Sequence, residues 1–363
     1  MTYKRWLKMF VLSCFALLSL VALFNFLVDE SELFRLHKGL KYAVANLLDG
    51  KMIAGPVGIR DMREFQRMIV EQYPKRRDMI AIGSSRCMPL RGRFINRDID
   101  FFNHSVPGAG LEDFMSIVGL YRIKGDLPRA VVLGIDPWIF NKNNPLQDWW
   151  KSLSRYYEEM VGEINGKEIK VNATQPTKYM QLINLDYTRA NYMSLRKGRK
   201  FYVTDTIDID DFVIEPDGSI HFPYELRFKA DERTNPYPPD SMPIRYLNHF
   251  EFLSGFELFE DFLHYLQKKK VDVILLLLPF HPVAYKLFND NPKCQIVISL
   301  EKYLKDFGLL NNIKVIGSYD PGRYQLGGKD FFDDEHGHDI VAKKVFQDYR
   351  WAKPSPSPIS PPS

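Results

Sequence analysis

The sequence predicts an α/β fold: a parallel sheet of five strands, covered by helices on both faces, behind one N-terminal transmembrane helix. Three observations predict it. From residue 77 onward, short apolar runs alternate with segments of helical periodicity. The apolar runs are largely uninterrupted, as in strands buried on both faces of a parallel sheet. An uncharged run of about 20 residues precedes them, long enough to cross the hydrocarbon core of a bilayer as a helix.

The N-terminal uncharged run comprises residues 9–28. Charged residues flank it, namely Lys4, Arg5 and Lys8 before it and Asp29, Glu30 and Glu32 after it. The basic flank stays in the cytoplasm, so we expect a single-pass membrane protein whose main domain is periplasmic or extracellular. A cleaved signal peptide is the alternative. Residues 24–28 form a poor cleavage site, which favours an uncleaved signal anchor over residues 1–30.

Composition narrows the class of protein. The chain has 363 residues, 45% of them hydrophobic, which suits one large domain or a core domain with an insertion. The formal net charge is only +4, which excludes a strongly basic nucleic-acid-binding protein. Three cysteines, Cys14, Cys87 and Cys294, are too few for a disulfide framework. No cofactor and no resident metal are expected.

The first half of the α/β domain follows a helical stalk predicted over residues 31–76. The domain itself is expected over residues 77–352. Apolar residues recur at helical spacing after the second expected strand and predict a helix there. The expected elements are strands at residues 79–83, 100–106 and 130–135 and a helix at 111–123.

Residues 138–248 break the alternation, because they are rich in Tyr, Pro, Asn and charge. We interpret them as an insertion in the domain. Pro216-Asp217-Gly218 separates two short apolar runs and predicts a hairpin of residues 212–214 with 220–222. The alternation then resumes with helices at 252–269, 295–307 and 340–349 and strands at 271–279 and 313–316. Residues 353–363 are rich in Pro and Ser and predict a disordered tail.

A candidate nucleophile follows the first strand, where the apolar run stops at Gly83-Ser84-Ser85. A tight turn after a buried strand exposes a serine hydroxyl and frees backbone N–H groups to stabilise an oxyanion. Glycine at position 83 permits close approach of the backbone. Taken alone, the same tripeptide also suits an ordinary turn or a helix cap.

A candidate base lies far downstream, in Asp333-Asp334-Glu335-His336. A carboxylate three residues before a histidine can bond the ring Nδ1 and leave Nε2 to accept the serine proton. Two alternatives stay open for this segment. The acidic and histidine residues from 330 to 339 also suit a metal site, or the acidic start of a helix.

Together, three segments resemble the SGNH (GDSL-like) hydrolase superfamily: Gly83-Ser84-Ser85, the segment 103–110, and Asp333-x-x-His336. The resemblance covers residues 77–135 and 271–349. It implies a three-layer α/β/α sandwich with a flavodoxin-like five-stranded sheet. It also implies Ser85 as nucleophile, His336 as base and Asp333 as its partner. The N–H groups of Ser85 and Gly108 would line the oxyanion hole, with Gly110 as the alternative donor.

One position departs from the pattern of the family, which often has Gly-x-Asn after the third strand. This chain has Gly134-Ile135-Asp136, and an ionised carboxylate would repel the oxyanion. We therefore expect Asp136 to turn away, toward Arg86. His281, at the end of the fourth strand, is a further residue expected to face the cleft.

The N-terminal anchor makes the chain similar to one branch of the superfamily, the alginate O-acetyltransferases and D-alanine transfer proteins. That similarity implies transfer of an acyl group, through an ester on Ser85, to a hydroxyl of a cell-envelope polysaccharide. An acyl donor, a carbohydrate acceptor and a membrane-bound O-acyltransferase are the implied partners. Two other functions stay open: a metal-dependent phosphoesterase that uses the Asp/His cluster, and a non-catalytic envelope scaffold.

Overall fold

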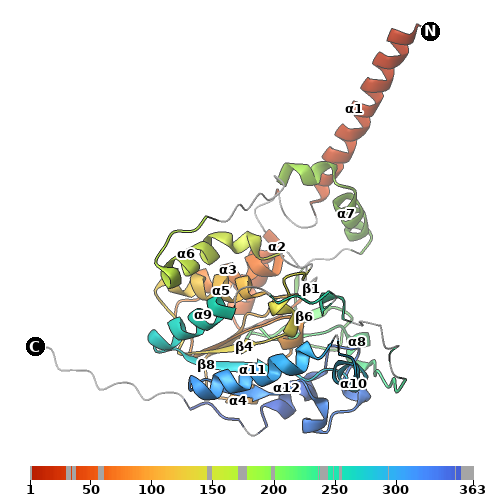
Figure 1. The fold of residues 1–363 in the computed structure, drawn as a ribbon. Coiled ribbons are helices and arrows are strands. Elements are labelled where there is room, and N and C mark those ends of the chain that lie inside the picture. The colour runs from red at the N-terminus through yellow and green to blue at the C-terminus, as the bar shows by residue number, and fades with distance from the viewer. Residues whose placement is uncertain are drawn as a thin grey trace, which may run out of the picture.

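The parallel sheet has five strands in the order β3-β2-β4-β8-β9 (Figure 1). Counted along the chain within this sheet, the order is 2-1-3-4-5. The strands are β2 (Met79–Ile82), β3 (Phe101–Asn103), β4 (Ala130–Gly134), β8 (Asp272–Leu277) and β9 (Lys314–Gly317). All four strand pairs are parallel. The computed structural model describes residues 2–352 except 30–33, 35–37, 56–60, 145–148, 171–177, 198–200, 236, 238–243, 248, 253–255, 293 and 348.

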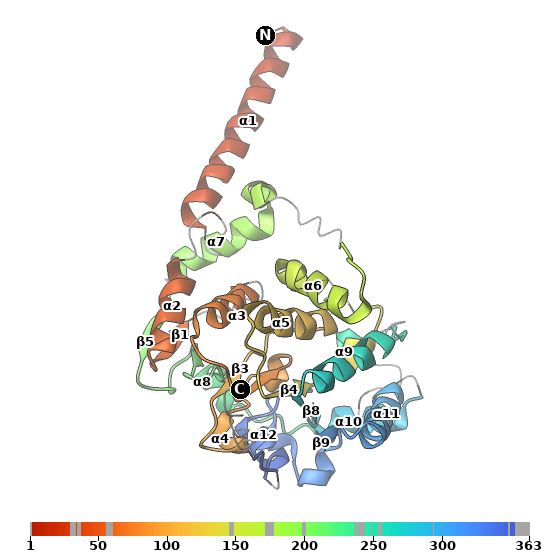
Figure 2. The same cartoon turned by 90° about the vertical axis from the view of Figure 1, so that its left-hand side faces the viewer.

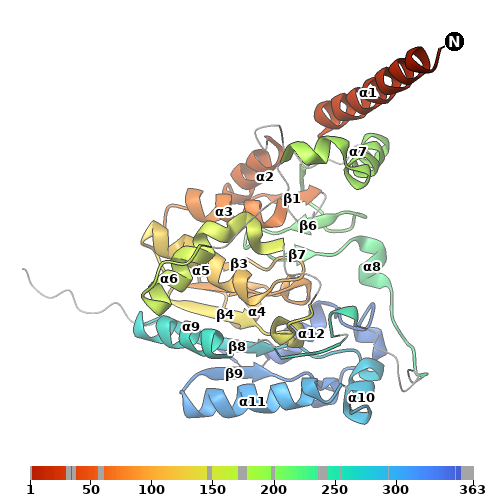
Figure 3. The same cartoon turned by 45° about the horizontal axis from the view of Figure 1, so that its top comes forward.

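Both faces of the parallel sheet are buried, which is why its strands are uninterrupted apolar runs. Along β2, Ile80 and Ile82 join the core on one face, whereas Met79 and Ala81 join the core on the other. The first face is covered by α3 (Asp61–Gln72), α5 (Leu111–Lys124), α9 (Phe256–Lys268) and α11 (Ile296–Leu310). The second is covered by α4 (Gly92–Ile95) and α12 (Asp339–Val345), as Figure 3 shows from another side. The predicted α/β class with a five-stranded parallel sheet is confirmed.

A second sheet is antiparallel, with strands in the order β5-β1-β6-β7. Its strands are β1 (Met52–Gly55), β5 (Tyr202–Thr204), β6 (Phe212–Ile214) and β7 (Ile220–His221). The pair β6–β7 is the predicted hairpin, and Gly218 takes the left-handed conformation in its turn. The segment 31–76, predicted as a helical stalk, contains strand β1 between the helices α2 (Lys38–Leu48) and α3. Ile53 is fully buried there because β1 pairs with segments about 150 residues away, which no local pattern reveals.

The remaining predicted elements are present with shifted ends. Strand β3 ends at Asn103, earlier than predicted, and Asn103 Oδ1 accepts the Ser105 N–H at 2.9 Å in a turn just after it. Helix α9 begins at Phe256 and α12 ends at Val345. Within the insertion lie η2 (Pro137–Phe140), η3 (Trp149–Leu153), α6 (Ser154–Asn165), η4 (Lys178–Ile183), α7 (Leu185–Lys197), α8 (Tyr224–Phe228) and η5 (Arg245–Leu247). Further elements are η1 (Ser85–Cys87), α10 (Pro282–Asp290), η6 (Pro321–Tyr324) and η7 (Gly328–Asp330). The predicted tail, residues 353–363, lies outside the described residues.

The N-terminal helix α1 (Tyr3–Val28) projects from the α/β body. Among the described residues it is the one helix that is long and apolar enough to cross a membrane, and it is largely exposed. This is consistent with a signal anchor or a signal sequence. Its C-terminal end contacts η4 and α7 (Figure 2), so part of the insertion returns to the base of α1.

Candidate active site

The turn after β2 separates the roles of its two serines. Ser84 precedes η1, and its hydroxyl accepts a hydrogen bond from the Arg86 N–H at 3.2 Å. A side chain at Gly83 would lie 2.6 Å from Cys87 Sγ, and one at Gly134 would lie 2.0 Å from it. The absence of side chains at Gly83 and Gly134 therefore lets the Cys87 side chain pack against the ends of β2 and β4, which keeps the turn close to the sheet. Ser84 is therefore the cap predicted as one interpretation of this turn, and Ser85, which follows it, is half-buried.

Ser85, His336 and Asp333 form a continuous line of contacts. Ser85 Oγ lies 2.8 Å from His336 Nε2, and His336 Nδ1 lies 2.8 Å from Asp333 Oδ2. Asp333 Oδ1 also accepts the backbone N–H groups of Glu335 and His336, at 2.9 and 2.7 Å. These backbone bonds fix the carboxylate in the loop, and the carboxylate then fixes the imidazole. This is the geometry of a nucleophile, a base and an orienting group.

The electrostatics of the pair agree with this geometry. Burial lowers the pKa of His336, but the hydrogen bond and charge of Asp333 outweigh burial, so the net pKa lies above its ordinary value. Burial raises the pKa of Asp333, but the hydrogen bond from His336 outweighs it, so the net pKa lies below the usual range. Asp333 is therefore ionised at neutral pH and favours the imidazolium that forms when His336 takes a proton.

Two aromatic rings hold the His336 ring in place. Phe332 stacks on it with ring centres 5.4 Å apart and planes 5° apart. Phe222 meets it edge-on at 5.9 Å and also packs against Phe332 at 5.0 Å. Sequence reasoning missed both residues. Phe332 directly precedes Asp333, a signal that could have been noticed, whereas Phe222 comes from the distant hairpin and has no local signal.

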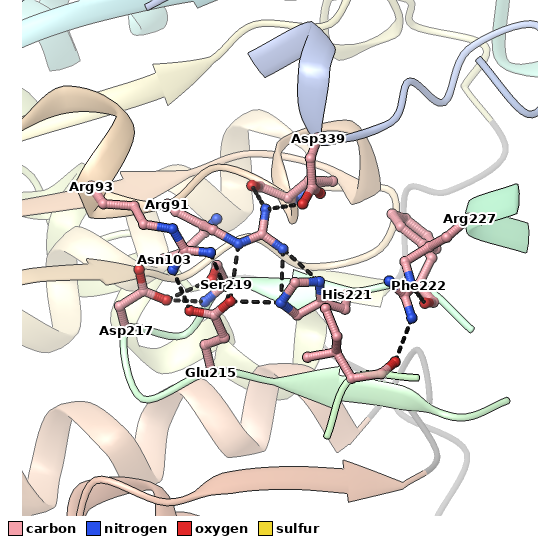
Figure 4. A network of polar contacts seen from close by, with 12 residues as sticks. Arg91, Arg93, Asn103, Glu215, Asp217, Ser219, His221, Phe222, Arg227 and Asp339 are labelled. Atoms are coloured by element: carbon pink, nitrogen blue, oxygen red, sulfur yellow. Dashed lines mark hydrogen bonds and ion pairs between the residues drawn. The ribbon is translucent and has the colours of Figure 1, made fainter. Parts of the chain in front are cut away.

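The hairpin that carries Phe222 is fixed by a buried polar network (Figure 4). Arg91 is fully buried. Its Nε lies 3.1 Å from Glu215 Oε1, its Nη2 lies 2.7 Å from His221 Nδ1, and its Nη1 lies 2.8 Å from Asp339 Oδ2. Burial raises the pKa of Glu215, but hydrogen bonds from His221 and Arg93 outweigh it and hold the pKa well below its usual range. The network thus ties the hairpin to the residues after the nucleophile and to the start of α12.

Backbone contacts bring the hairpin against the same turn. The Ile220 N–H donates to the Met88 carbonyl at 2.8 Å, and the Asn103 N–H donates to the Asp217 carbonyl at 2.8 Å. A side chain at Gly218 would lie 2.6 Å from the Asn103 carbonyl oxygen, so this approach requires glycine. The insertion therefore forms one wall of the candidate site.

Candidate oxyanion donors lie beside Ser85. The Val106 N–H bonds the Gly83 carbonyl at 2.9 Å, which brings the loop after β3 next to the nucleophile turn. Within the described part of the chain, the N–H groups of Ser85 and Gly108 have no hydrogen-bond partner. The Gly110 N–H instead donates to Asp113 Oδ2 at 3.0 Å. That bond occupies the Gly110 N–H and leaves Gly108, in the left-handed conformation, as the remaining glycine candidate.

Asp136 turns toward Arg86. Their side chains are buried and lie 2.5 Å apart, and burial raises the pKa of Asp136 against the opposing pull of Arg86. The Arg86 guanidinium also lies 3.8 Å from the centre of the Phe280 ring. Arg86 Nε donates to the Glu335 carbonyl at 2.8 Å. Arg86 follows Ser85, and Glu335 precedes His336. The Arg86 side chain therefore connects the segment that carries Ser85 to the segment that carries His336.

The acidic residues around His336 point to separate partners. Asp330 accepts the Gly327 N–H at 2.8 Å, and Asp339 pairs with Arg91. Asp334 pairs with Arg233 at 2.7 Å. Over the part of the chain that the structure describes, no three His, Cys, Asp or Glu side chains converge to hold a metal ion. The metal-site alternative therefore has no ligand set among these residues.

His281 is fully buried, and both of its ring nitrogens have backbone partners. Nδ1 accepts the Val283 N–H at 3.2 Å, and Nε2 donates to the Asp231 carbonyl at 2.8 Å. Its own backbone N–H donates to the Asp334 carbonyl at 3.1 Å. His281 thus supports the loop that carries Asp333 and His336, and its ring is committed to that support.

A pocket of about 180 Å³ opens beside the loop that carries His336. Its walls include Phe222, Phe332, Arg227 and Gly337. This volume is below the roughly 300–1,000 Å³ of pockets that enclose drug-sized ligands.

The fold defines the class of protein: an α/β protein with a five-stranded parallel sheet, a four-stranded antiparallel sheet and one long apolar N-terminal helix. No family model matches the chain, and a search of curated proteins finds no significant match.

Proposed function

We propose that this chain is a membrane-anchored, extracytoplasmic serine acyltransferase or esterase of the SGNH type. Its proposed substrates are O-acyl groups of a cell-envelope polysaccharide. The observation that carries the proposal is the line from Ser85 through His336 to Asp333, with 2.8 Å at each step. The strand order 2-1-3-4-5 supports it as the order of flavodoxin-like sheets, in which ligands bind at the carboxyl ends of the strands. Helices on both faces fit a three-layer α/β/α sandwich.

The first half-reaction forms an ester on Ser85. His336 Nε2 accepts the hydroxyl proton as Ser85 Oγ attacks the carbonyl carbon of the donor. The N–H groups of Ser85 and Gly108 stabilise the oxyanion. The bond from the acyl carbon to the leaving oxygen then breaks, and His336 returns the proton to that oxygen. Asp333 stabilises the imidazolium between the two proton transfers.

The second half-reaction transfers the acyl group to an acceptor hydroxyl. His336 takes the acceptor proton as the acceptor oxygen attacks, and Ser85 recovers a proton when it leaves. Water and a sugar hydroxyl compete at this step. A sugar held beside the acyl-serine gains from proximity, so binding of the acceptor decides between transfer and hydrolysis.

Helix α1 supports the proposed location, because an uncleaved signal anchor with a basic N-terminal flank places the domain outside the cytoplasm. In this proposal a membrane-bound O-acyltransferase delivers the acyl group. The chain itself needs no cofactor, since the serine, histidine and carboxylate suffice for acyl transfer.

The test is the intact mass of the full-length protein after incubation with p-nitrophenyl acetate. We expect one acetyl adduct on Ser85, absent from Ser85→Ala and present in the matched control Ser84→Ala, which keeps the Ser85 hydroxyl. Faster discharge to a glycan than to water identifies a transferase, and equal discharge identifies an esterase. Stable, folded protein with neither adduct nor turnover would leave the non-catalytic scaffold as the better account.

A further inference from the structure

The junction between α1 and the insertion has polar side chains inside and apolar side chains outside. Asn25 and Asn191 are fully buried and Asp29 is 2% exposed, whereas Leu185 is 82% and Leu195 is 60% exposed. Water-soluble surfaces normally show the opposite distribution. The other strongly exposed apolar side chains of η4 and α7 are Tyr179, Met180, Ile183, Tyr192 and Met193.

The buried polar groups of the junction satisfy one another. Asn25 Nδ2 donates to the Leu182 carbonyl at 2.8 Å and to Thr188 Oγ1 at 2.7 Å. Asn191 Nδ2 donates to Asn25 Oδ1 at 3.0 Å, and the Tyr187 hydroxyl donates to Asp29 Oδ1 at 2.6 Å. A bilayer offers no water to pair with such groups, so structures within it satisfy them internally. The junction therefore already meets the requirement for contact with lipid.

One side of helix α7 contacts α1, and the opposite side is exposed. At 100° per residue, Leu185 and Tyr192 lie within about 20° of each other around the helix axis. Tyr187 and Asn191 lie on the other side, where they bond α1. The outward side of α7 is exposed and apolar, as is most of α1, and α7 lies at the base of α1 in all three views (Figures 1–3).

We propose that η4 and α7 form a membrane-contact element, which lies in the extracytoplasmic interface of the bilayer that α1 spans. The inference rests on the proposed membrane anchoring and is independent of the acyl chemistry. The occupant of the apolar face is lipid, because this surface adjoins the membrane-spanning candidate. Amphipathic helices in the membrane–water interface bury an apolar face among the lipids. Tyrosine is enriched in that interface, and the element carries Tyr179 and Tyr192. The element fixes the orientation of the α/β domain on the membrane.

The test places one fluorescent label on the full-length protein in phosphatidylcholine vesicles, with and without brominated acyl chains. A Cys14→Ser background leaves only the buried Cys87 and Cys294, and Leu185→Cys supplies the labelled site. Leu309→Cys is the matched control, since Leu309 is an equally exposed leucine (84%) on α11, far from α1. Native Cys14, exposed on α1, reports insertion of α1 itself.

We expect brominated lipid to quench the labels at Cys14 and Leu185→Cys and to leave the label at Leu309→Cys unchanged. Aqueous iodide should quench only the label at position 309. Quenching at Cys14 with a water-exposed label at position 185 would overturn the contact and spare the anchor. A label at position 185 that neither quencher reaches would assign the face to a protein instead. Unquenched Cys14 would overturn both the anchor and the contact. Tyr192→Cys repeats the test on the same face.

Discussion

The region around Ser85 and the junction between α1 and α7 bury opposite kinds of side chain. At the ends of β2 and β4, the apolar side chains are inside, and the few buried charges such as Arg86 and Asp136 are paired. At the base of α1, Asn25 and Asn191 are inside, and leucine and methionine side chains are outside. The difference is the one we expect if the first region faces water and the second, as we propose, faces lipid.

Both regions nevertheless depend on contacts between segments far apart in the sequence. His336 reaches Ser85 from 251 positions away, and Asn191 reaches Asn25 from 166 positions away. Around Ser85 such contacts bring the three candidate catalytic side chains together. In the junction they pair buried polar groups with one another. Substitutions in each region should therefore damage different properties, activity in one and attachment in the other.

The largest effect should follow loss of the nucleophile. Ser85→Ala should lower kcat for a small acetyl ester by about 10⁴–10⁶-fold, because the remaining base has no oxygen to activate. The fold should survive, since the change removes one partly exposed oxygen. Esterase assay and circular dichroism of purified protein check this. Ser84→Ala should keep most of the activity, and equal losses in both variants would assign the effect to the turn.

The second effect is on pH dependence. His336 must be neutral to accept a proton, and Asp333 raises its pKa above the ordinary value, so kcat/KM should fall as pH drops through that raised pKa. Asp333→Asn removes the charge that raises it. The acidic limb of the profile should then move to lower pH, and kcat should drop by about 10⁴-fold. An unmoved limb would mean that another group titrates.

The third effect is on stability. Arg86→Met leaves Asp136 as a buried, unpaired carboxylate and should cost about 3–5 kcal/mol of unfolding free energy. Arg93→Met is the matched control, because the Arg93 side chain is 50% exposed in its ion pair with Glu215 and should cost about 0–1 kcal/mol. Chemical denaturation measures both. Similar losses in the two variants would contradict the importance of the buried pair.

The smallest effect should appear at the junction. Asn25→Leu leaves Asn191 without one buried partner and should weaken the packing of α7 on α1 by about 1–3 kcal/mol. Ser19→Leu, the same kind of change on the exposed surface of α1, is the control. Hydrogen exchange of α7 in vesicles should rise for the first variant alone, with esterase activity unchanged in both. Equal exchange would separate α7 from the anchor.

The sequence reveals the parts that depend on local patterns. The strands of the parallel sheet are predictable because both faces are buried, which produces apolar runs such as 130–135. The candidate triad is predictable because Ser85 closely follows one such run and Asp333 lies three residues before His336. The ion pair of Arg86 with Asp136 is predictable because an unpaired Asp136 carboxylate would repel an oxyanion formed at Ser85.

The parts that depend on distant contacts are not predictable in this way. Strand β1 is too short to show periodicity, and its partners come from the insertion. Phe222 is one of many aromatic residues until the hairpin brings it to His336. The apolar residues of α7 resemble a buried core in the sequence, and only the fold shows that polar residues occupy the inner side instead.

The central claim is that His336 activates Ser85 as a nucleophile, and covalent labelling tests it most directly. Full-length protein in detergent is treated with a serine-directed fluorophosphonate, and the label is mapped by peptide mass spectrometry. The account predicts one label, on Ser85, that is absent from Ser85→Ala and forms far more slowly in His336→Ala. A label on another residue, or an unlabelled protein that still hydrolyses esters, would contradict it.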